Sequence, residues 1–225
     1  MQEKEKEKDN IIEELSVKSV EDLRTIFEEF QKKMSYYKCA LYEVETKFKV
    51  LNEQFALLHE RNPIETIKTR IKTVDSIREK VERKKLNYRS SREIEENIHD
   101  IAGIKIICPF IDDIYMLADC LRKQDDVEVL KEKDYIKNPK PNGYRSYHMI
   151  IEIPIFLQNE KKFVKVEVQL RTIAMECWAN LEHRIRYKKN LSAEMLSKVS
   201  EDLLKCAELT EKLDLEMQEI KNEVE

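Results

Sequence analysis

The chain lacks any apolar run that approaches the roughly 18 residues a membrane-spanning helix needs. Its first ten residues, MQEKEKEKDN, contain no apolar core, so we expect no secretory signal. No CxxC pair is present, which argues against a zinc site and against a disulfide framework. The five cysteines are scattered, at Cys39, Cys108, Cys120, Cys177 and Cys206. These absences predict reduced thiols in a cytoplasmic protein with no membrane partner.

A strong excess of charge of one sign is also missing. The net charge is −4 although 38% of the 225 residues are charged. No global field therefore draws the protein onto DNA or an anionic membrane.

Glycine is rarer still, with two residues in the whole chain. One of them lies in KNPKPNGYRSYH, residues 137–148, beside two lysines, an arginine, two tyrosines and a histidine. The pair Asn142-Gly143 predicts a tight turn in which the glycine adopts a positive φ. Side chains that bind phosphates and stack on bases are thus concentrated at one turn.

Helical periodicity marks both ends of the chain. Apolar residues recur at steps of three or four from Leu23 to Leu58, and again from Leu196 to Ile220. Such seams fit packing against the chain's own helices, and they equally fit a subunit interface. We expect an N-terminal helical region at 1–62, a central domain at 63–190, and a C-terminal packing or oligomer helix at 191–225.

The middle of the chain changes period. Strands are predicted, from apolar runs and period-two alternation, at 101–110, 126–132, 147–156 and 163–170. Helices are predicted at 112–124 and 172–189. Strands flanked by helices, with further helices at both ends, indicate the α+β class.

Polar side chains gather on the predicted strands. In FVKVEVQLRT the valines share one face, while Lys165, Glu167, Gln169 and Arg171 share the other. A solvated face would give the same pattern, but Ser146 and His148 on the neighbouring strand favour a site.

An acidic residue, Asp100, directly precedes the buried strand at 101–110. Together with Glu167 it could hold a magnesium ion, which prefers oxygen ligands. The sequence alone does not bring the two carboxylates together.

A basic segment lies at 61–92, with eleven lysines and arginines against four acidic residues. Within it, Ser76 and Lys80 are one helical turn apart and share a face. A solvated helix, a cradle for polyphosphate and an RNA-binding surface all fit this composition, although no aromatic-interleaved RNA-binding strand is present.

Five motifs resemble one known family. RIKTVDSIREK (70–80), HDIAGIKII (99–107), KDYIKNPKPNGYRSYH (133–148) and VEVQLRT (166–172) occur in the order seen in RelA/SpoT-type (p)ppGpp synthetases. The continuation LRTIAMECWANLEHRIRYK (170–188) is similar to the stand-alone small alarmone synthetases of that family. The resemblance covers residues 64–189.

The resemblance implies a nucleotidyltransferase-like mixed sheet and a defined reaction. The β,γ-pyrophosphate of ATP would pass to the 3′-hydroxyl of GDP or GTP, giving ppGpp or pppGpp and AMP. Asp100 would bind Mg²⁺, and Glu167 would complete the metal site or take the hydroxyl proton. The ATP-binding residues would be Arg70, which stacks on adenine, with Lys72, Ser76, Lys80, Arg83 and Lys105. The GDP- or GTP-binding residues would be Lys133, Lys140, Asn142, Tyr144, His148 and Gln169, with Tyr144 stacking on guanine.

Lys105 stands where the family usually has arginine, and it lacks the flat guanidinium that would sandwich adenine against Arg70, so weaker ATP binding is expected. Glu176 could accept the N1 and N2 protons of guanine, or it could be an exposed acid at a helix start.

Two other functions stay open on the residues alone. His99-Asp100 resembles part of an HD-type phosphohydrolase, but the chain has only four histidines, and we expect synthesis without hydrolysis. A catalytically silent scaffold that binds nucleotide or RNA is the second alternative. The resemblance also implies a homo-oligomer, with a tetramer as one form, while an RNA effector cannot be read from the sequence.

Overall fold

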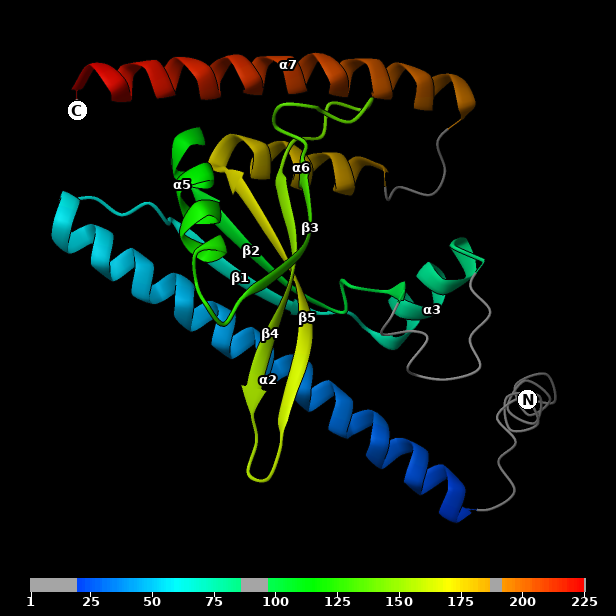
Figure 1. Cartoon of the computed structure of the whole chain (residues 1–225). Helices are drawn as coiled ribbons and strands as arrows, with labels where there is room; N and C mark the ends of the chain where they lie inside the picture. The colour runs from blue at the N-terminus through cyan, green and yellow to red at the C-terminus, as the bar shows by residue number, and fades with distance from the viewer. Residues whose placement is uncertain (1–19, 86–96, 187–191, 225) are drawn as a thin grey trace. The chain divides into compact units, whose positions relative to one another are not determined.

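The computed structural model describes residues 20–85, 97–186 and 192–224. The elements in chain order are α2 (Val20–His59), β1 (Thr66–Ile71), α3 (Val74–Arg83), β2 (Ala102–Cys108), α5 (Ile111–Arg122), β3 (Glu128–Asp134), β4 (Tyr147–Phe156), β5 (Lys161–Thr172), α6 (Ile173–Arg186) and α7 (Ala193–Val224) (Figure 1). Of the described residues, those up to Tyr36 belong to one unit and those from Tyr37 onward to another. The sheet and the helices that follow it all belong to the second unit.

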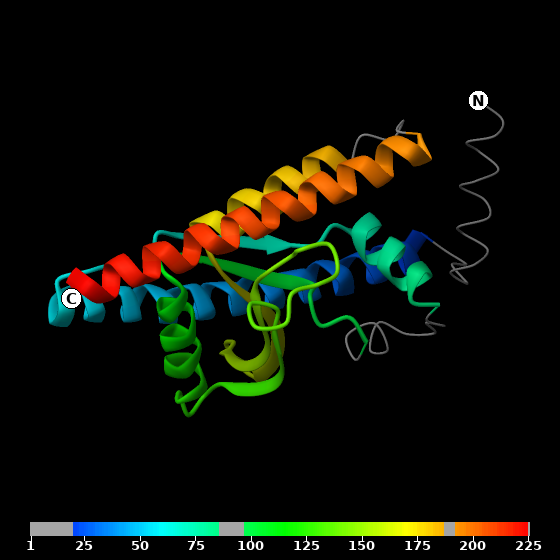
Figure 2. The ribbon, with the colours of Figure 1, turned by 90° about the horizontal axis from the view of Figure 1, so that it is seen from above.

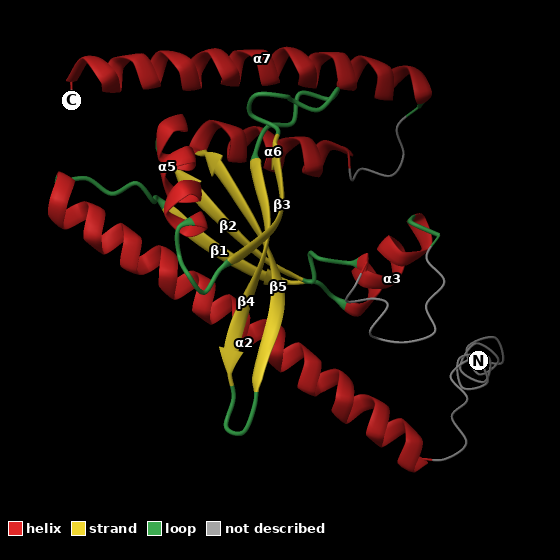
Figure 3. Cartoon of the chain, in the orientation of Figure 1, coloured by secondary structure: helices red, strands yellow, loops and turns green. Residues whose placement is uncertain are grey.

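The five strands form one sheet in the order β1-β2-β5-β4-β3. The central pair, β2 and β5, is parallel, and the three other pairs are antiparallel. The predicted α+β class with a mixed sheet is therefore confirmed (Figure 3). The parallel pair matters for function because it places residues far apart in sequence, such as Gly103 and Glu167, directly opposite each other.

One face of the sheet is apolar and forms the core. Side chains alternate along a strand, so every second residue of β2, β4 and β5 points to this face. The fully buried ones are Ile104, Ile106, Met149, Ile151, Ile153, Val166, Val168 and Leu170. Helix α5 packs against β2 and β5, and its Ile114, Leu117 and Leu121 are fully buried. Each such side chain contributes about 1.5–3 kcal/mol by leaving water.

Helix α2 belongs to the same unit from Tyr37 onward and runs along the sheet (Figures 1 and 2). It buries Leu41, Val44 and Phe48. The Nζ of Lys47 donates to Asp126 at 2.6 Å, and the Asn52 side chain accepts from the backbone N–H of Ile64 at 3.2 Å. Helix α2 lies within the N-terminal helical region expected at 1–62, of which residues 1–19 lie outside the described residues.

The last two helices, α6 and α7, lie side by side (Figure 2). Trp178 on α6 forms a buried cluster with Leu203 and Ala207 on α7. The face of α7 turned toward the rest of the unit also buries Asp214 and Lys221. Part of the predicted C-terminal seam stays outside this contact, since Leu213 and Ile220 are 51% and 53% exposed.

In the part of the chain that the structure describes, no helix has the length and apolarity needed to cross a membrane.

Candidate active site

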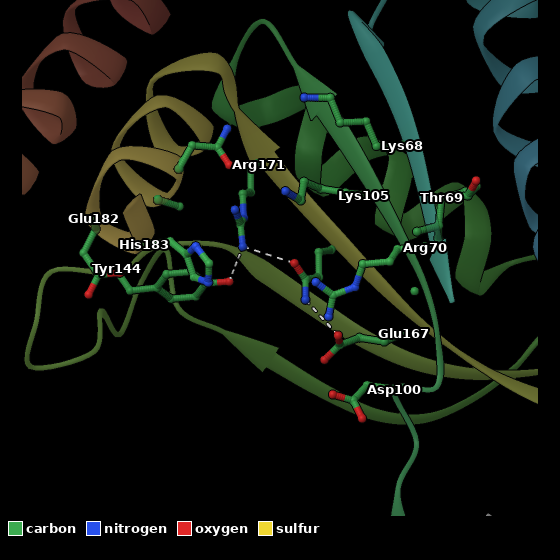
Figure 4. A pocket seen from close by; sticks show the side chains of 15 residues that line it. Lys68, Thr69, Arg70, Asp100, Lys105, Tyr144, Glu167, Arg171, Glu182 and His183 are labelled. Atoms are coloured by element: carbon green, nitrogen blue, oxygen red, sulfur yellow. Dashed lines mark hydrogen bonds between the residues drawn. The ribbon is translucent and has the colours of Figure 1, made fainter. Parts of the chain in front are cut away.

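A cavity of about 530 Å³ opens on the polar face of the sheet, between the strands and α6 (Figure 4). Its lining combines cationic, acidic and amide side chains with one tyrosine. Residues that line it are Lys68, Thr69, Arg70, Asp100, Gly103, Ile104, Lys105, Tyr144, Glu167, Gln169, Arg171, Ala179, Asn180, Glu182 and His183. A cavity with this lining suits a ligand that carries negative charge and a planar ring better than it suits an apolar ligand.

The two predicted carboxylates meet in this cavity. Asp100 lies just before β2, and Glu167 lies on β5, the parallel neighbour of β2. Figure 4 shows the two side chains next to each other at the same end of the cavity. The arrangement follows from the register, because Gly103, three residues after Asp100, is paired with Glu167. Gly103 has no side chain, so the space beside the Glu167 carboxylate stays open to the cavity.

Two lysines hold one oxygen of Asp100. The Nζ atoms of Lys72 and Lys80 donate to Oδ2 at 2.6 Å and 2.5 Å. Burial raises the pKa of Asp100, but the two lysines outweigh it, so that the net pKa lies below the ordinary value. Burial also lowers the pKa of Lys72, although Asp100 opposes this. Asp100 is therefore a carboxylate at neutral pH.

The other oxygen of Asp100 fits a metal ion. Oδ1 is buried and has no hydrogen-bond partner among the described residues. A buried carboxylate oxygen without a partner is costly, and a divalent cation would compensate it. No cluster of three His, Cys, Asp or Glu side chains exists in the described ranges. Magnesium does not need one, since it binds through one or two carboxylates and completes its shell with waters and phosphate oxygens.

Glu167 is held by neighbours on its own and the next strand. Gln169 donates to Oε2 at 2.8 Å, and His148 Nδ1 lies 3.6 Å from Oε1. Burial raises the pKa of Glu167, but the contacts with His148 and Gln169 bring the net pKa below the ordinary value. Glu167 is thus ionised and oriented toward the cavity.

Tyr144 is fixed from two sides. Its hydroxyl accepts a hydrogen bond from Arg171 Nη2 at 2.6 Å and lies 2.8 Å from His148 Nε2. The guanidinium carbon of Arg171 also stands 5.0 Å from the centre of the tyrosine ring. The predicted turn is present, with Gly143 at φ +85° and its N–H donating to the Lys140 carbonyl at 2.8 Å. A fixed aromatic ring in a polar cavity is a stacking surface for a base.

One row of register partners crosses all five strands. It runs from β1 to β3 through Lys68, Lys105, Gln169, His148 and Lys133. Register partners point to the same face of a sheet, so this row brings positive charge to the polar face. Together with Arg70 and Arg171, it makes the cavity suited to polyphosphate.

Lys105 and Glu176 form an ion pair. Lys105 Nζ donates to Glu176 Oε1 at 2.8 Å, and Arg171 Nη1 donates to Oε2 at 2.7 Å. Asn180 adds a hydrogen bond at 3.1 Å. Glu176 is 7% exposed and does not line the cavity, so its role as a guanine reader stays a prediction.

The structure gathers most of the predicted site residues at the cavity. Six of them line it directly: Arg70, Asp100, Lys105, Tyr144, Glu167 and Gln169. Five others contact a lining residue: Lys72, Lys80, His148 and Glu176 through the contacts given above, and Asn142 by accepting from the N–H of Tyr144 at 3.3 Å.

The remaining four predicted residues, Lys133, Lys140, Ser76 and Arg83, do not line the cavity. Lys140 Nζ stands 4.6 Å from the Tyr144 ring centre, and Lys133 Nζ stands 5.8 Å from the Tyr135 ring centre. Ser76 is in the first turn of α3, where the Thr73 hydroxyl caps the helix by accepting from the Ser76 N–H at 3.3 Å. Arg83 is in the last turn of the same helix.

Several lining residues were not predicted as site residues. Lys68 lies two positions before Arg70 on the same strand face, and Arg171 two positions after Gln169, so strand alternation was the available signal. Asn180, Glu182 and His183 reach the cavity from α6. Their place depends on how α6 folds back over the sheet, which no local pattern shows.

Comparison with known proteins agrees with this geometry. Residues 69–192 match the family described as "Region found in RelA / SpoT proteins". The chain is 44% identical to the GTP pyrophosphokinase YwaC of Bacillus subtilis (strain 168), over 94% of this chain and 100% of the relative. It is 38% identical to YjbM of the same organism, over 84% of this chain and 87% of that protein.

Solved structures lead to the same group. The small alarmone synthetase 1 of Bacillus subtilis, crystallised with its product pppGpp, superimposes with a TM-score of 0.78 at 36% identity, over 88% of this chain and 98% of that one. The small alarmone synthetase 2 of the same organism superimposes with a TM-score of 0.76 at 42% identity, over 87% and 99%. The paired carboxylates, the cationic row, the family match and these neighbours lead to one conclusion: the chain belongs to the RelA/SpoT family, among its small alarmone synthetases.

Proposed function

We propose that the protein is a GTP pyrophosphokinase that transfers the β,γ-pyrophosphate of ATP to the 3′-hydroxyl of GDP or GTP. The products are ppGpp or pppGpp and AMP, which act in stringent-response signalling. The observation that carries the proposal is the meeting of Asp100, just before β2, and Glu167, on the neighbouring strand β5, in a cavity that is also lined by Lys68, Arg70, Lys105 and Arg171.

The reaction needs positioning more than covalent chemistry from the protein. A bond forms between the 3′-oxygen and the β-phosphorus of ATP, and the bond from that phosphorus to the oxygen bridging the α- and β-phosphates breaks. AMP leaves with that oxygen. Glu167, ionised and held by Gln169 and His148, either takes the hydroxyl proton or serves as the second metal ligand.

The two nucleotides are assigned to opposite sides of the carboxylates. On the β1–α3 side, Arg70 stacks on adenine with Lys105 on the other side of the base, while Lys72, Ser76, Lys80 and Arg83 hold the ATP phosphates. On the β3–β4 side, Tyr144 stacks on guanine, while Lys133, Lys140, Asn142, His148, Gln169 and Glu176 bind the rest of GDP or GTP. Preorganised cations of this kind stabilise the charge that develops on transferred phosphoryl oxygens.

Magnesium is the proposed cofactor, held by Asp100 and Glu167. The free Oδ1 of Asp100 supports this assignment, because it needs a partner that the described residues do not provide. When bound, the ion would neutralise charge on the bridging phosphate oxygens. The lysines on Oδ2 leave the other carboxylate oxygen for the metal.

A product assay tests the proposal. The protein is incubated with ATP, GDP and magnesium, and nucleotides are separated on an anion-exchange column. AMP and a guanosine tetraphosphate should rise in equal amounts. If neither forms while GDP still binds, the catalytically silent scaffold becomes the better description.

We propose synthesis without hydrolysis. His99 directly precedes Asp100, but no three metal-ligating side chains come together in the described ranges, as an HD-type hydrolase site would require. Incubation with ppGpp and manganese should leave the nucleotide intact. Release of pyrophosphate would overturn this part of the proposal.

We also propose a homo-oligomer in the cytoplasm, with the C-terminal helix as a contact. Support comes from the apolar residues on α7 that stay exposed, among them Leu209, Leu213 and Ile220. Light scattering on the purified protein would give the mass, and Leu213→Glu should reduce it. An unchanged mass in that variant would exclude this face of α7 as the contact.

A further inference from the structure

The C-terminal helix packs directly on the turn that carries Tyr144. Gly143 has a φ of +85°, and a Cβ built on it would come 2.4 Å from the Cβ of Ala207 and 3.3 Å from Cδ1 of Leu204. Both the backbone conformation and the lack of space require glycine at this position. The backbone of the turn therefore packs directly on the Ala207 and Leu204 side chains of α7.

Arg145, two residues after Gly143, attaches the turn to α7 by polar contacts. It is 5% exposed. Its Nη2 donates to the Ala207 carbonyl at 3.1 Å and to the Thr210 hydroxyl at 3.2 Å, and its Nη1 lies 3.4 Å from Glu211 Oε1. A buried guanidinium is tolerated only where its donors are paired, and these partners are all on α7. The side chain therefore binds the turn to one position along the helix.

Tyr144, between these two residues, also contacts the interface. It packs against the cluster that Trp178 of α6 forms with Leu203 and Ala207 of α7. The indole N–H of Trp178 donates to the Leu203 carbonyl at 2.8 Å. The ring of Tyr144 is thus supported by α7 on one side, while Arg171 holds its hydroxyl.

We propose that α7 is a structural part of the guanosine site, and that Arg145 is a positioning residue through which the place of this helix sets the place of Tyr144. The inference rests on the proposed function, which assigns Tyr144 to guanine. The inference predicts that loosening this contact weakens the binding of the guanosine nucleotide and leaves the binding of ATP unchanged. Asp100 and Glu167 are positioned chiefly by β2 and β5, and Arg70 by β1, and these three strands are held together by their own pairing.

Steady-state kinetics on two variants test the proposal. Arg145→Lys keeps the charge but cannot bond to the Ala207 carbonyl and the Thr210 hydroxyl together as the guanidinium does. Thr210→Val removes one of these two acceptors. The KM for GDP should rise about tenfold in Arg145→Lys, which corresponds to about 1.4 kcal/mol, and less in Thr210→Val. The kcat and the KM for ATP should stay close to the wild-type values. Lys212→Gln, an α7 change at a 75% exposed side chain, is the matched control and should behave as wild type.

A second readout uses Trp178, the one tryptophan in the sequence. Its emission should shift to the red in Arg145→Lys, because a looser α7 exposes the indole. Addition of GDP alone should reverse the shift, since coupling between a ligand and a helix position is reciprocal.

The outcomes separate this inference from the proposed function. If the wild type makes no AMP, the proposed function fails, while the response of Trp178 to GDP still tests the role of α7. If turnover is present but the KM for GDP is unchanged in both variants, or the KM for ATP rises equally, the inference fails. Should Arg145→Lys not fold, as thermal unfolding would show, Thr210→Val carries the test alone.

Discussion

Gly103 on β2 lies directly opposite Glu167 on β5, and its missing side chain leaves the space beside the carboxylate free. A Cβ at Gly103 would meet the carbonyl oxygens of Arg70 and Glu167 at 3.8 Å and 3.9 Å, which is ordinary contact. The fold would therefore accept a Cβ at this position, and we expect the glycine to serve the ligand instead.

Gly103→Ala should fold normally and still turn over more slowly, and Gly103→Val should be inactive, because each added methyl occupies space next to Glu167. Thermal unfolding and the AMP assay measure the two effects separately. A valine variant with wild-type kcat would show that the nucleotides do not approach β2 at this point.

Glu167→Gln should lower kcat by roughly 10²–10⁴-fold, the range typical for loss of an acid–base group. Binding of GDP, measured by calorimetry, should remain, since the amide keeps the shape of the carboxylate. Loss of the folded state would instead assign Glu167 a structural role. Glu152→Gln on β4 serves as a control in the same sheet.

Tyr144→Ala should raise the KM for GDP about tenfold or more, because stacking on a base is worth about 1–3 kcal/mol. Tyr144→Phe keeps the ring and loses only the hydroxyl that contacts Arg171 and His148. It should therefore have a smaller effect. Equal KM values for the wild type and the alanine variant would remove Tyr144 from the site.

Lys105→Arg should lower the KM for ATP by about two- to fivefold, as a guanidinium adds a stacking surface worth about 0.5–1 kcal/mol. The variant can keep the ion pair with Glu176, so the KM for GDP should not change. An unchanged KM for ATP would mean that adenine does not reach this residue.

Glu176→Gln should lower stability at neutral pH and alter its pH dependence. Burial raises the pKa of Glu176, but Lys105 and Arg171 bring the net pKa below the ordinary value of 4.5. A carboxyl with a depressed folded-state pKa stabilises the protein above 4.5, and this contribution disappears as the pH falls through the folded-state pKa. The stability difference between wild type and variant, from urea unfolding, should thus shrink in acid.

Glu201→Gln, at an exposed α7 side chain, is the control for this comparison. It should show no such change with pH. A difference between wild type and Glu176→Gln that stays constant at all pH values would contradict the ionic role of Glu176.

Much of the central sheet could be predicted because its strands are amphipathic or fully apolar. The strand at 147–156 was predicted with the bounds that β4 has, and β2 and β5 differ from their predictions by one or two residues at each end. The Asn142-Gly143 turn also follows from local chemistry, since only glycine adopts its φ easily. Residues 187–189 of the last predicted central helix lie outside the described residues.

The edge strand β1 was not predicted, and the reason is physical. Its sequence, TIKTRI, carries four polar residues in six because β1 pairs only with β2 and its outer face is polar. By composition, β1 therefore cannot be distinguished from the basic segment at 61–92 that contains it. Contacts such as Lys105 with Glu176 join residues 71 positions apart, and no periodicity encodes them. The convergence of Asp100 with Glu167 likewise needed the parallel register of β2 and β5.

Under the proposed assignment, the strand order places the two substrates on different parts of the sheet. The proposed ATP residues extend from the β1 edge and the proposed guanosine residues from the β3 edge, with the carboxylates at the middle pair. Substitutions near either edge of the sheet can consequently change the affinity for one nucleotide without disturbing the other nucleotide or the central acids. Relatives that differ in their choice between GDP and GTP should accordingly differ near β3 and the turn at Gly143, and remain alike around α3.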